Sequence, residues 1–318
     1  MNVLVFGAAG QLGKAFHALL SGRKDLDLKY VGRAECDLTN PLAITQVLEQ
    51  SHAQLIINAA AYTAVDQAEN DAESAFAVNA NAPELMALYA VKHNATLLHY
   101  STDYVFDGSK SGFYLEDDVC NPLGVYGKSK RAGEVAIQKA FESGKAGQYA
   151  ILRTSWVYGD GGNFIRTILR LAKEREELKV INDQYGVPTS ADWLACISLE
   201  LVLGAHSQIK TFPSGIYHAV PAGETTWYGL ATQVIHSAIE AGVMLKLKPE
   251  SVKPIPAIEY PLPAPRPQNS RMATQKLCSI LLSKRENPSN SYNHVSQGDV
   301  FPDWRKMVQK YVSDLIAK

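Results

Sequence analysis

The chain has 318 residues, of which 46% are hydrophobic and 20% are charged, and its formal net charge at pH 7 is −1. This length allows one large α/β unit or two smaller domains with a sizeable core. The balanced charge offers no basic surface for nucleic acid or for an anionic membrane, so we expect neither as a partner.

The first half of the chain alternates short apolar strands with amphipathic helices. Near-continuous apolar runs of this length suit strands that are buried on both faces of a parallel sheet. Repeated βα units predict a Rossmann-type, doubly wound parallel sheet with right-handed crossovers. The strands are predicted at Val3–Phe6, Leu28–Val31, Leu55–Asn58, Thr96–Tyr100 and Tyr149–Leu152, and the helices at Gln11–Leu20, Pro41–Gln50, Ala72–His93 and Tyr126–Glu142.

The second half of the chain has a looser pattern. Lys253–Gln268 contains six prolines, and because proline cannot donate to a sheet ladder we expect an extended surface loop there. Ser283–Gly298 is polar and patternless, which predicts a long or partly disordered loop. We expect residues 1–155 to form the sheet domain and residues 156–318 mainly a smaller, interleaved lobe over the ligand cleft. Helices in this half are predicted at Phe164–Arg175, Ala191–Leu203, Thr226–Ala241 and Trp304–Ile316.

Several residue patterns bear on the cellular compartment and on metal binding. The four cysteines are far apart and form no CxxC pair, which predicts reduced thiols in a cytoplasmic protein rather than disulfides or a zinc site. The eight histidines show no ligand spacing, so we expect no metal bound by them. The chain begins directly with a strand, and no apolar stretch reaches the roughly 18 residues that span a bilayer.

A glycine-spaced turn follows the first strand and opens the first helix. Gly7, Gly10 and Gly13 would permit a tight turn, close approach of the backbone to a pyrophosphate, and close packing of helix on strand. The helix N-terminus would offer free N–H groups to the phosphates. The turn therefore predicts a dinucleotide site; it would also fit FAD, but nothing later in the chain indicates a flavin.

The residue after the second strand bears on which dinucleotide binds. Val31-Gly32-Arg33 has no acidic residue where a carboxylate for the NAD ribose would be expected. Arg33 could hold a 2′-phosphate or stack on adenine, or it could be an ordinary exposed arginine. We predict NADPH as the cofactor, with NADH tolerated.

Tyr126 and Lys130 form a YxxxK pair at the start of the helix after the fourth strand. The two side chains would lie one helical turn apart on the same face. A free phenol has a pKa of about 10, and we expect the nearby ammonium to lower that pKa toward the range useful for acid–base work. Such a motif arises by chance, but this is the only one among 15 tyrosines. We predict that Tyr126 and Lys130 are catalytic.

Two polar residues leave the fourth strand at its carboxyl end, the edge where open α/β sheets bind ligands. Thr102 could donate a hydrogen bond to a substrate carbonyl. Asp103 could orient a sugar hydroxyl or act in a proton relay, although it could equally cap the following turn.

Together these residues resemble the extended short-chain dehydrogenase/reductases, and most closely the dTDP-4-dehydrorhamnose reductase family. The resemblance covers nearly the whole chain. Besides the glycine turn, it rests on 36–38, 58–66, 79–80, 101–106, 125–130, 153–159, 162–164, 183–189, 266–271 and 302–305. It implies the last step of dTDP-L-rhamnose synthesis, which is NADPH-dependent reduction of the C4 ketone of dTDP-4-dehydro-L-rhamnose, a nucleotide-sugar substrate.

The resemblance also implies roles for individual residues. Those for the cofactor are Gln11 and Leu12 at the phosphates, Asp37 and Leu38 at the adenine, and Ala61, Tyr62 and Thr63 on its inner face. Those for the reaction are Tyr126 as the proton donor with Lys130 as its partner, Thr102 and Asp103 near the reacting sugar, and Trp156 packed on it.

The chain departs from the family pattern at one residue, and two alternative functions stay open. Some family members use a glutamate with Mg²⁺ at a dimer interface; here that residue is Ala15, so both Mg²⁺ and a homodimer stay open. Another nucleotide-sugar enzyme, an epimerase or a dehydratase, is an alternative, although Tyr104 stands where related dehydratases have a glutamate. The other alternative is a non-catalytic subunit resembling the regulatory subunit of methionine adenosyltransferase.

Overall fold

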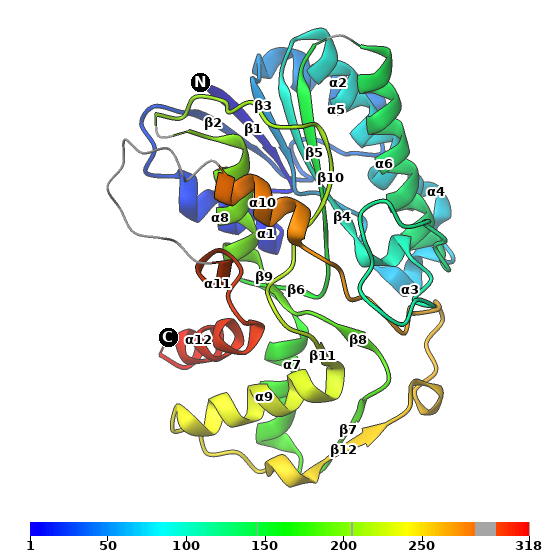
Figure 1. The fold of residues 1–318 in the computed structure, drawn as a ribbon, viewed down its shortest axis with the longest axis vertical. Helices are drawn as coiled ribbons and strands as arrows, with labels where there is room; N and C mark the ends of the chain where they lie inside the picture. Colours follow the sequence, from blue (N-terminus) through cyan, green and yellow to red (C-terminus); the bar gives the residue numbers. More distant parts are fainter. Residues whose placement is uncertain (145, 205, 284–296, 318) are drawn as a thin grey trace.

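A six-stranded sheet with only parallel neighbours forms the centre of the upper part of the molecule in Figure 1. The computed structural model describes residues 1–144, 146–204, 206–283 and 297–317. The strand order is β10-β5-β4-β3-β1-β2, which confirms the predicted doubly wound parallel sheet. The strands are β1 (Asn2–Phe6), β2 (Asp27–Val31), β3 (Leu55–Asn58), β4 (Thr96–Thr102), β5 (Gln148–Thr154) and β10 (Gly215–His218).

Helices cover both faces of this sheet, so each strand is buried on two sides. Because successive side chains of a strand point to opposite faces, Val3 and Val5 of β1 join one core while Leu4 and Phe6 join the other. This explains why the strands read as continuous apolar runs. One face is covered by α1 (Gln11–Leu20), α8 (Ala191–Val202) and α10 (Gln275–Ser283), and the other by α2 (Pro41–Ser51), α5 (Ala82–Lys92) and α6 (Val125–Ser143).

The order of the strands fixes where a ligand can enter. From β1 the chain moves to β2 on one side and then returns to β3 on the other side of β1. Such a reversal leaves a crevice at the carboxyl ends of the two strands where the direction changes. The glycine turn at Gly7 lies at this point, directly after β1.

A second lobe lies below the sheet in Figure 1 and has its own apolar core. Its helices are α7 (Phe164–Glu174), α9 (Trp227–Glu240) and α12 (Trp304–Ile316). Three short pairs of strands join them: β6 (Val157–Tyr158) with β9 (Thr189–Ser190), β7 (Leu178–Ile181) with β12 (Val252–Ile255), and β8 (Tyr185–Gly186) with β11 (Thr225–Thr226). The remaining short elements are α3 (Val65–Ala68), α4 (Ala72–Phe76), η1 (Ala77–Asn81), η2 (Asp103–Val105), η3 (Pro249–Ser251), η4 (Ala257–Glu259) and α11 (Gln297–Val300).

The structure departs from the sequence predictions in two segments. The helix expected over Ala72–His93 is interrupted by the π-helical turn η1. The proline-rich segment is not wholly a loop, because Val252–Ile255 pairs with β7 and places Pro254 opposite Val180; a two-stranded pair consists of edges, where proline is tolerated. Most of the loop expected at 283–298 lies outside the described residues.

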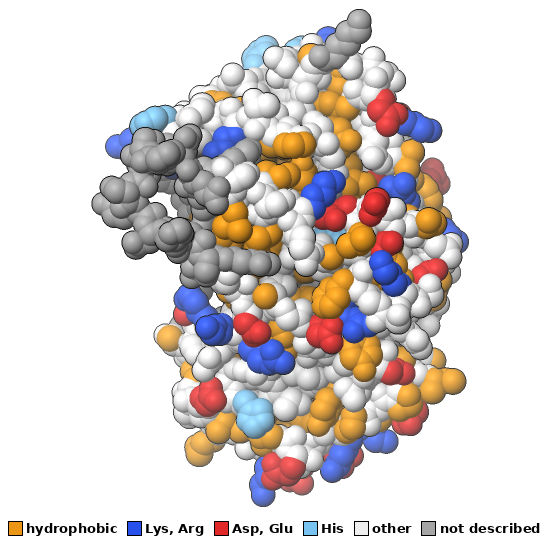
Figure 2. All heavy atoms as spheres, viewed as in Figure 1, with side chains coloured by type: hydrophobic (Ala, Val, Ile, Leu, Met, Phe, Trp, Pro, Cys, Tyr) orange, Lys and Arg blue, Asp and Glu red, His pale blue; other side chains and the backbone are white. Residues whose placement is uncertain are grey.

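The second half of the chain also contributes to the sheet layer. Strand β10 extends the sheet beside β5, and α8 and α10 pack on it. The domain boundary at residue 155 stays a prediction. Basic and acidic side chains are interspersed on the face shown in Figure 2, and no helix in the described part of the chain is long and apolar enough to cross a bilayer.

Candidate active site

The loop after β1 packs tightly around the start of α1. Gly7 has a φ of 82°, and its N–H donates to the carbonyl of Val31 at 2.9 Å. A Cβ at Gly7 would lie 2.6 Å from the nitrogen of Ala60, and a Cβ at Gly13 would lie 2.1 Å from the Gly7 oxygen. Both positions therefore require glycine, one for its conformation and one for close contact.

The N-terminus of α1 is open to a ligand. Its N-cap residue, Gly10, is extended and provides no side-chain cap, and the first N–H groups of a helix have no partner within it. This end can therefore receive a pyrophosphate on the N–H groups of Gln11, Leu12 and Gly13. The side chain of Leu12 lies in the core, so only its main chain is available for the predicted contact.

The turn after β2 carries one residue that the sequence did not single out. Arg33 is exposed, and its proposed contact with a 2′-phosphate or an adenine stays a prediction. The carboxylate of Glu35, however, folds back and accepts the N–H of Gly32 at 2.8 Å. A carboxylate therefore does stand at the end of β2, where the sequence suggested that none was present. This correction bears on the choice between NADPH and NADH.

Asp37 and Leu38, which the resemblance assigns to the adenine, follow in the same turn. The carboxylate of Asp37 accepts the N–H and the hydroxyl of Thr39, both at 2.9 Å. These bonds, chiefly the one from the N–H, hold the pKa of Asp37 below its usual range. Leu38 is half-buried against the core beneath α2.

Asn79 joins the loop after β3 to the helix that carries the tyrosine. Its Oδ1 accepts the N–H of Tyr62 at 2.9 Å, and its Nδ2 donates to the carbonyl of Tyr62 at 3.1 Å and to Ser129 Oγ at 3.0 Å. Asn79 lies in the π-helical turn, a feature that often marks functional sites. It fixes the loop containing Ala61, Tyr62 and Thr63 against α6, next to Lys130.

Tyr126 lies in the first turn of α6. The carboxylate of Glu69 accepts the N–H of Val125 at 2.8 Å and so takes the place of a side-chain cap. The ring of Tyr104 contacts Tyr126 edge-on, with centroids 5.5 Å apart. The phenol is thereby held at the carboxyl edge of the sheet, beside Thr102.

The pKa of Tyr126 is shifted in the direction opposite to our prediction. Burial raises it to about 12; a hydrogen bond with Thr102 acts to lower it, and the charge of Asp103 acts to raise it. The predicted lowering by the ammonium of Lys130 is therefore wrong for this structure. The phenol is held in its protonated form near neutral pH.

Thr102 and Asp103 form a buried pair at the end of β4. The hydroxyl of Thr102 donates to Asp103 Oδ1 at 2.9 Å and accepts the N–H of Tyr104 at 3.2 Å. Asp103 Oδ2 has no hydrogen-bond partner among the described residues. Burial raises the pKa of Asp103 to about 6, although hydrogen bonds from Ser270 and Thr102 oppose this. Asp103 can therefore change its charge near neutral pH.

Lys130 lies one turn along α6 and is only 2% exposed. Its Nζ donates to the carbonyl of Tyr100 at 2.5 Å and lies 3.5 Å from His99 Nε2. Burial lowers the pKa of the amine to about 8, and the charge of Glu134 acts to raise it. Glu134 is itself buried and accepts two hydrogen bonds of 2.8 Å from Arg153.

Trp156 follows β5 with a φ of 48°, a strained conformation for a bulky residue. It stacks on Trp227 with ring centroids 3.7 Å apart. Both line a cavity of about 150 Å³ that also contacts Gln11 and Asn163. The structure thus brings the second lobe against the end of α1 where phosphates can bind.

The segment 264–270 returns from the second lobe to the sheet domain. Arg266 forms an ion pair of 2.8 Å with Asp66 of α3, and the N–H of Ala264 donates to the same carboxylate at 3.0 Å. Ser270 at its end contacts Asp103. We call residues 264–270 the strap, because they tie the two halves of the chain together beside Tyr126.

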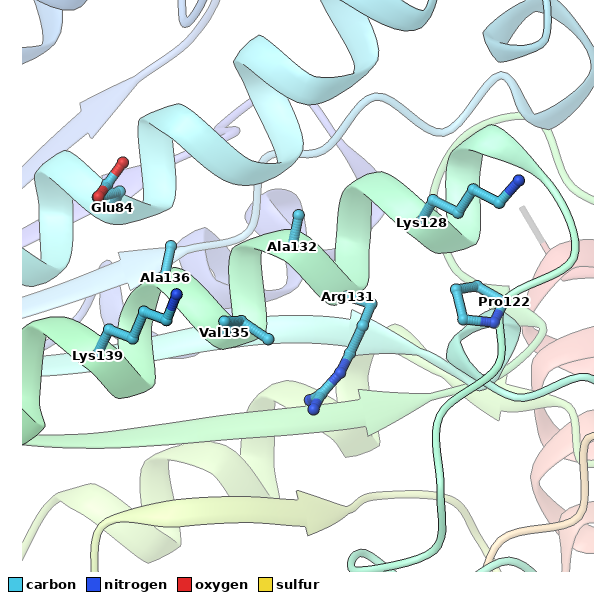
Figure 3. Close-up of a pocket in the computed structure, with 8 residues that line it drawn as sticks. All are labelled: Glu84, Pro122, Lys128, Arg131, Ala132, Val135, Ala136 and Lys139. Atoms are coloured by element: carbon cyan, nitrogen blue, oxygen red, sulfur yellow. The ribbon is translucent and has the colours of Figure 1, made fainter.

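A larger open groove, of about 430 Å³, lies on the outer face of α6 (Figure 3). Its basic residues are Lys128, Arg131 and Lys139, whereas Lys130 is buried on the opposite side of the helix. The groove is therefore separate from the catalytic residues. In the described part of the chain, no cluster of three or more histidine, cysteine or acidic residues could hold a metal ion, and Ala15 is buried in α1.

Comparisons with known proteins show what the whole chain is similar to. The family model described as "RmlD substrate binding domain" matches residues 1–313. A dTDP-4-dehydrorhamnose reductase from Escherichia coli K12 is 39% identical over 324 residues, covering 100% of this chain and 99% of the relative. A solved reductase of that name from Clostridium acetobutylicum has a TM-score of 0.83 at 31% identity, with both chains covered completely. Another, from Bacillus anthracis in complex with NADP, has a TM-score of 0.81 at 31% identity and 99% coverage of both chains.

Proposed function

The chain belongs to the RmlD substrate-binding-domain family, and on that basis we propose that it reduces the C4 ketone of dTDP-4-dehydro-L-rhamnose with NADPH to give dTDP-L-rhamnose. This is the last step of dTDP-rhamnose biosynthesis. The observation that carries the proposal is the meeting of Tyr126, Thr102 and Asp103 at the edge of the sheet that also bears the glycine turn.

The chain has a cradle that suits a dinucleotide. The turn leaves no room for a side chain at Gly7 or Gly13, where the backbone must approach a pyrophosphate, and α1 presents its free N–H groups there. Arg33, Asp37 and Leu38 would lie toward the adenine end, and Ala61, Tyr62 and Thr63 toward the nicotinamide end. A bound nicotinamide cofactor supplies the hydride that is added to the ketone carbon.

The protein's own residues supply the proton. Tyr126, protonated near neutral pH, gives its proton to the ketone oxygen as the carbon accepts the hydride, so that the ketone becomes an alcohol. Thr102 donates a hydrogen bond to the same oxygen once its hydroxyl turns from Asp103. Lys130, on the same helix, would bind the cofactor ribose, and its ammonium form would return a proton to the phenolate and become a neutral amine.

The second lobe would bind the rest of the substrate. We assign residues 156–318 mainly to the nucleotide sugar, with Trp156 packed on the sugar ring. The left-handed backbone of Trp156 and its stacking on Trp227 support this role, because strain of this kind collects at ligand sites. A cytoplasmic reaction fits the free thiols of the described cysteines.

The preference between cofactors follows from two opposing side chains. Arg33 favours the 2′-phosphate of NADPH, whereas the carboxylate of Glu35 can accept a hydrogen bond from the 2′-hydroxyl of NADH. We propose that NADPH is preferred and NADH is used. A homodimer and a role for Mg²⁺ remain hypotheses, because the glutamate that binds Mg²⁺ in some relatives is replaced by Ala15.

One assay tests the proposal directly. Purified protein is given dTDP-4-dehydrorhamnose, the loss of NADPH absorbance is followed, and the assay is repeated with UDP- and GDP-linked ketosugars. Tyr126→Phe should keep NADPH affinity but lower kcat by about 10²-fold or more, the scale of a lost general acid. Unchanged turnover in that variant would remove Tyr126 from the mechanism, and cofactor binding without any turnover would favour a regulatory subunit.

A further inference from the structure

His99 is a buried titratable residue that the proposed reaction does not use. It lies on β4 with no exposed surface, between Asn58 at the end of β3 and Lys130 on α6. Its Nδ1 is 3.0 Å from Asn58 Nδ2, and its Nε2 is 3.5 Å from Lys130 Nζ. Asn58 and Lys130 are only 1% and 2% exposed, so the three side chains form a buried polar row behind the active site.

The contacts of Asn58 decide which nitrogen of His99 carries a proton. Asn58 Oδ1 accepts the N–H of Ala60 at 3.2 Å, which leaves its Nδ2 facing the imidazole as a donor. His99 Nδ1 must therefore accept. Burial, and then the charge of Lys130, lower the pKa of His99 well below its usual range, so the ring is neutral. A neutral imidazole has one proton, and here it lies on Nε2.

This tautomer matters for the amine that it faces. An Nε2–H cannot accept a hydrogen bond from an ammonium, but it can donate to the lone pair of a neutral amine. The amine is at the same time tied to the carbonyl of Tyr100. We propose that His99 is a positioning residue for Lys130: Asn58 fixes its tautomer, and the resulting N–H holds the neutral amine that is left when the ammonium has given up its proton.

The other charged groups near Lys130 do not favour its neutral form as His99 does. On α6, Glu134 favours the ammonium, but its carboxylate is shared with Arg153 of β5. Asp103 of η2 influences Tyr126 in the first turn of α6. From β4, therefore, the imidazole is the titratable group that faces the amine. The inference depends on Lys130 acting in the proposed reductase, but the tautomer of His99 can be measured without turnover.

The test reverses the tautomer with an isosteric change. In Asn58→Asp, one carboxylate oxygen keeps the Ala60 N–H while the other requires a proton on His99 Nδ1, so that Nε2 becomes an acceptor for the ammonium. Histidine ¹⁵N NMR should show the Nε2–H form in the unaltered protein and the Nδ1–H form in the variant. The titration of Lys130, followed with ¹³C-labelled lysine and assigned with Lys130→Arg, should move upward by about one pH unit or more.

Two further measurements separate the effect of the His99 tautomer from the general effect of adding a negative charge at residue 58. The pH profile of kcat should move with the amine while the KM for the ketosugar stays the same. In a His99→Phe background, Asn58→Asp should no longer move the Lys130 titration. An Nδ1–H tautomer in the unaltered protein, or an equal shift in both backgrounds, would overturn the proposal. A protein that shows the expected NMR behaviour but reduces no ketosugar would instead refute the proposed function.

Discussion

Asp103→Asn should make the protein more stable at neutral pH while lowering its activity. The carboxyl is 2% exposed, its Oδ2 has no partner among the described residues, and burial raises its pKa to about 6. An aspartate in the unfolded chain has a pKa of about 3.9. The folded protein therefore binds this proton more tightly than the unfolded chain does, and the associated stability is present below about pH 4 and lost as the pH rises through 6.

The size of the effect follows from that difference. At about 1.36 kcal/mol per pH unit, the charged carboxylate costs about 3 kcal/mol at pH 7.5 but only about 1 kcal/mol at pH 4.5. Asparagine removes the charge and keeps an acceptor for Thr102. The free energy of unfolding should therefore rise by about these two amounts, measured by urea denaturation at the two pH values. Turnover of the ketosugar should fall, as is common where an active site carries strain.

A nearby carboxylate provides the matched control. Hydrogen bonds, first from the N–H and hydroxyl of Ser109, hold the pKa of Asp107 well below its usual range. Asp107→Asn should therefore destabilise the protein near neutral pH, with a smaller loss in acid. If Asp103→Asn does not raise the free energy of unfolding at pH 7.5, or raises it equally at both pH values, the reasoning about its buried charge is refuted.

Three other predictions concern the cofactor and the core. Arg33→Ala should weaken NADPH binding more than NADH binding in fluorescence titrations, and equal losses would refute the 2′-phosphate role. Gly13→Ala, whose Cβ would meet the turn, should weaken NADPH binding by about tenfold or more, whereas Gly22→Ala, with open space around it, should not. Glu134→Gln should lower the free energy of unfolding by about 3–5 kcal/mol in urea denaturation, because it leaves the buried guanidinium of Arg153 without a charged partner. The control Arg131→Gln should lower it by about 1 kcal/mol or less, because the Arg131 side chain is 32% exposed. Similar losses for the two variants would contradict this reasoning.

The sequence predicted the elements whose signals are local. Strand β3 and helix α1 were predicted with the bounds that the structure shows, because an apolar run or an amphipathic period is complete within each segment. Strand β10 was missed, since Gly215–His218 is short and its burial comes from neighbours distant in the chain. The π-helical turn was missed because it depends on contacts of Asn79 with residues 62 and 129.

The chemistry of the site was predicted less completely than its residues. The residue types and spacing of Tyr126 and Lys130 could be read directly, but their pKa values depend on burial and on Asp103, which spacing does not reveal. His99 looked like one of several scattered histidines, because its partners lie on two other elements. Glu35 was missed since a turn, rather than sequence adjacency, brings its carboxylate to Gly32.

Because elements of the second half of the chain pack on the sheet domain, the protein should not divide into two independent fragments. A fragment ending at residue 155 would leave the edge of β5 without β10 and one sheet face without α8. It would also lack the strap residue Arg266, whose partner is Asp66. The catalytic half should therefore be recovered only by co-expression with its complement, and the two pieces should purify together.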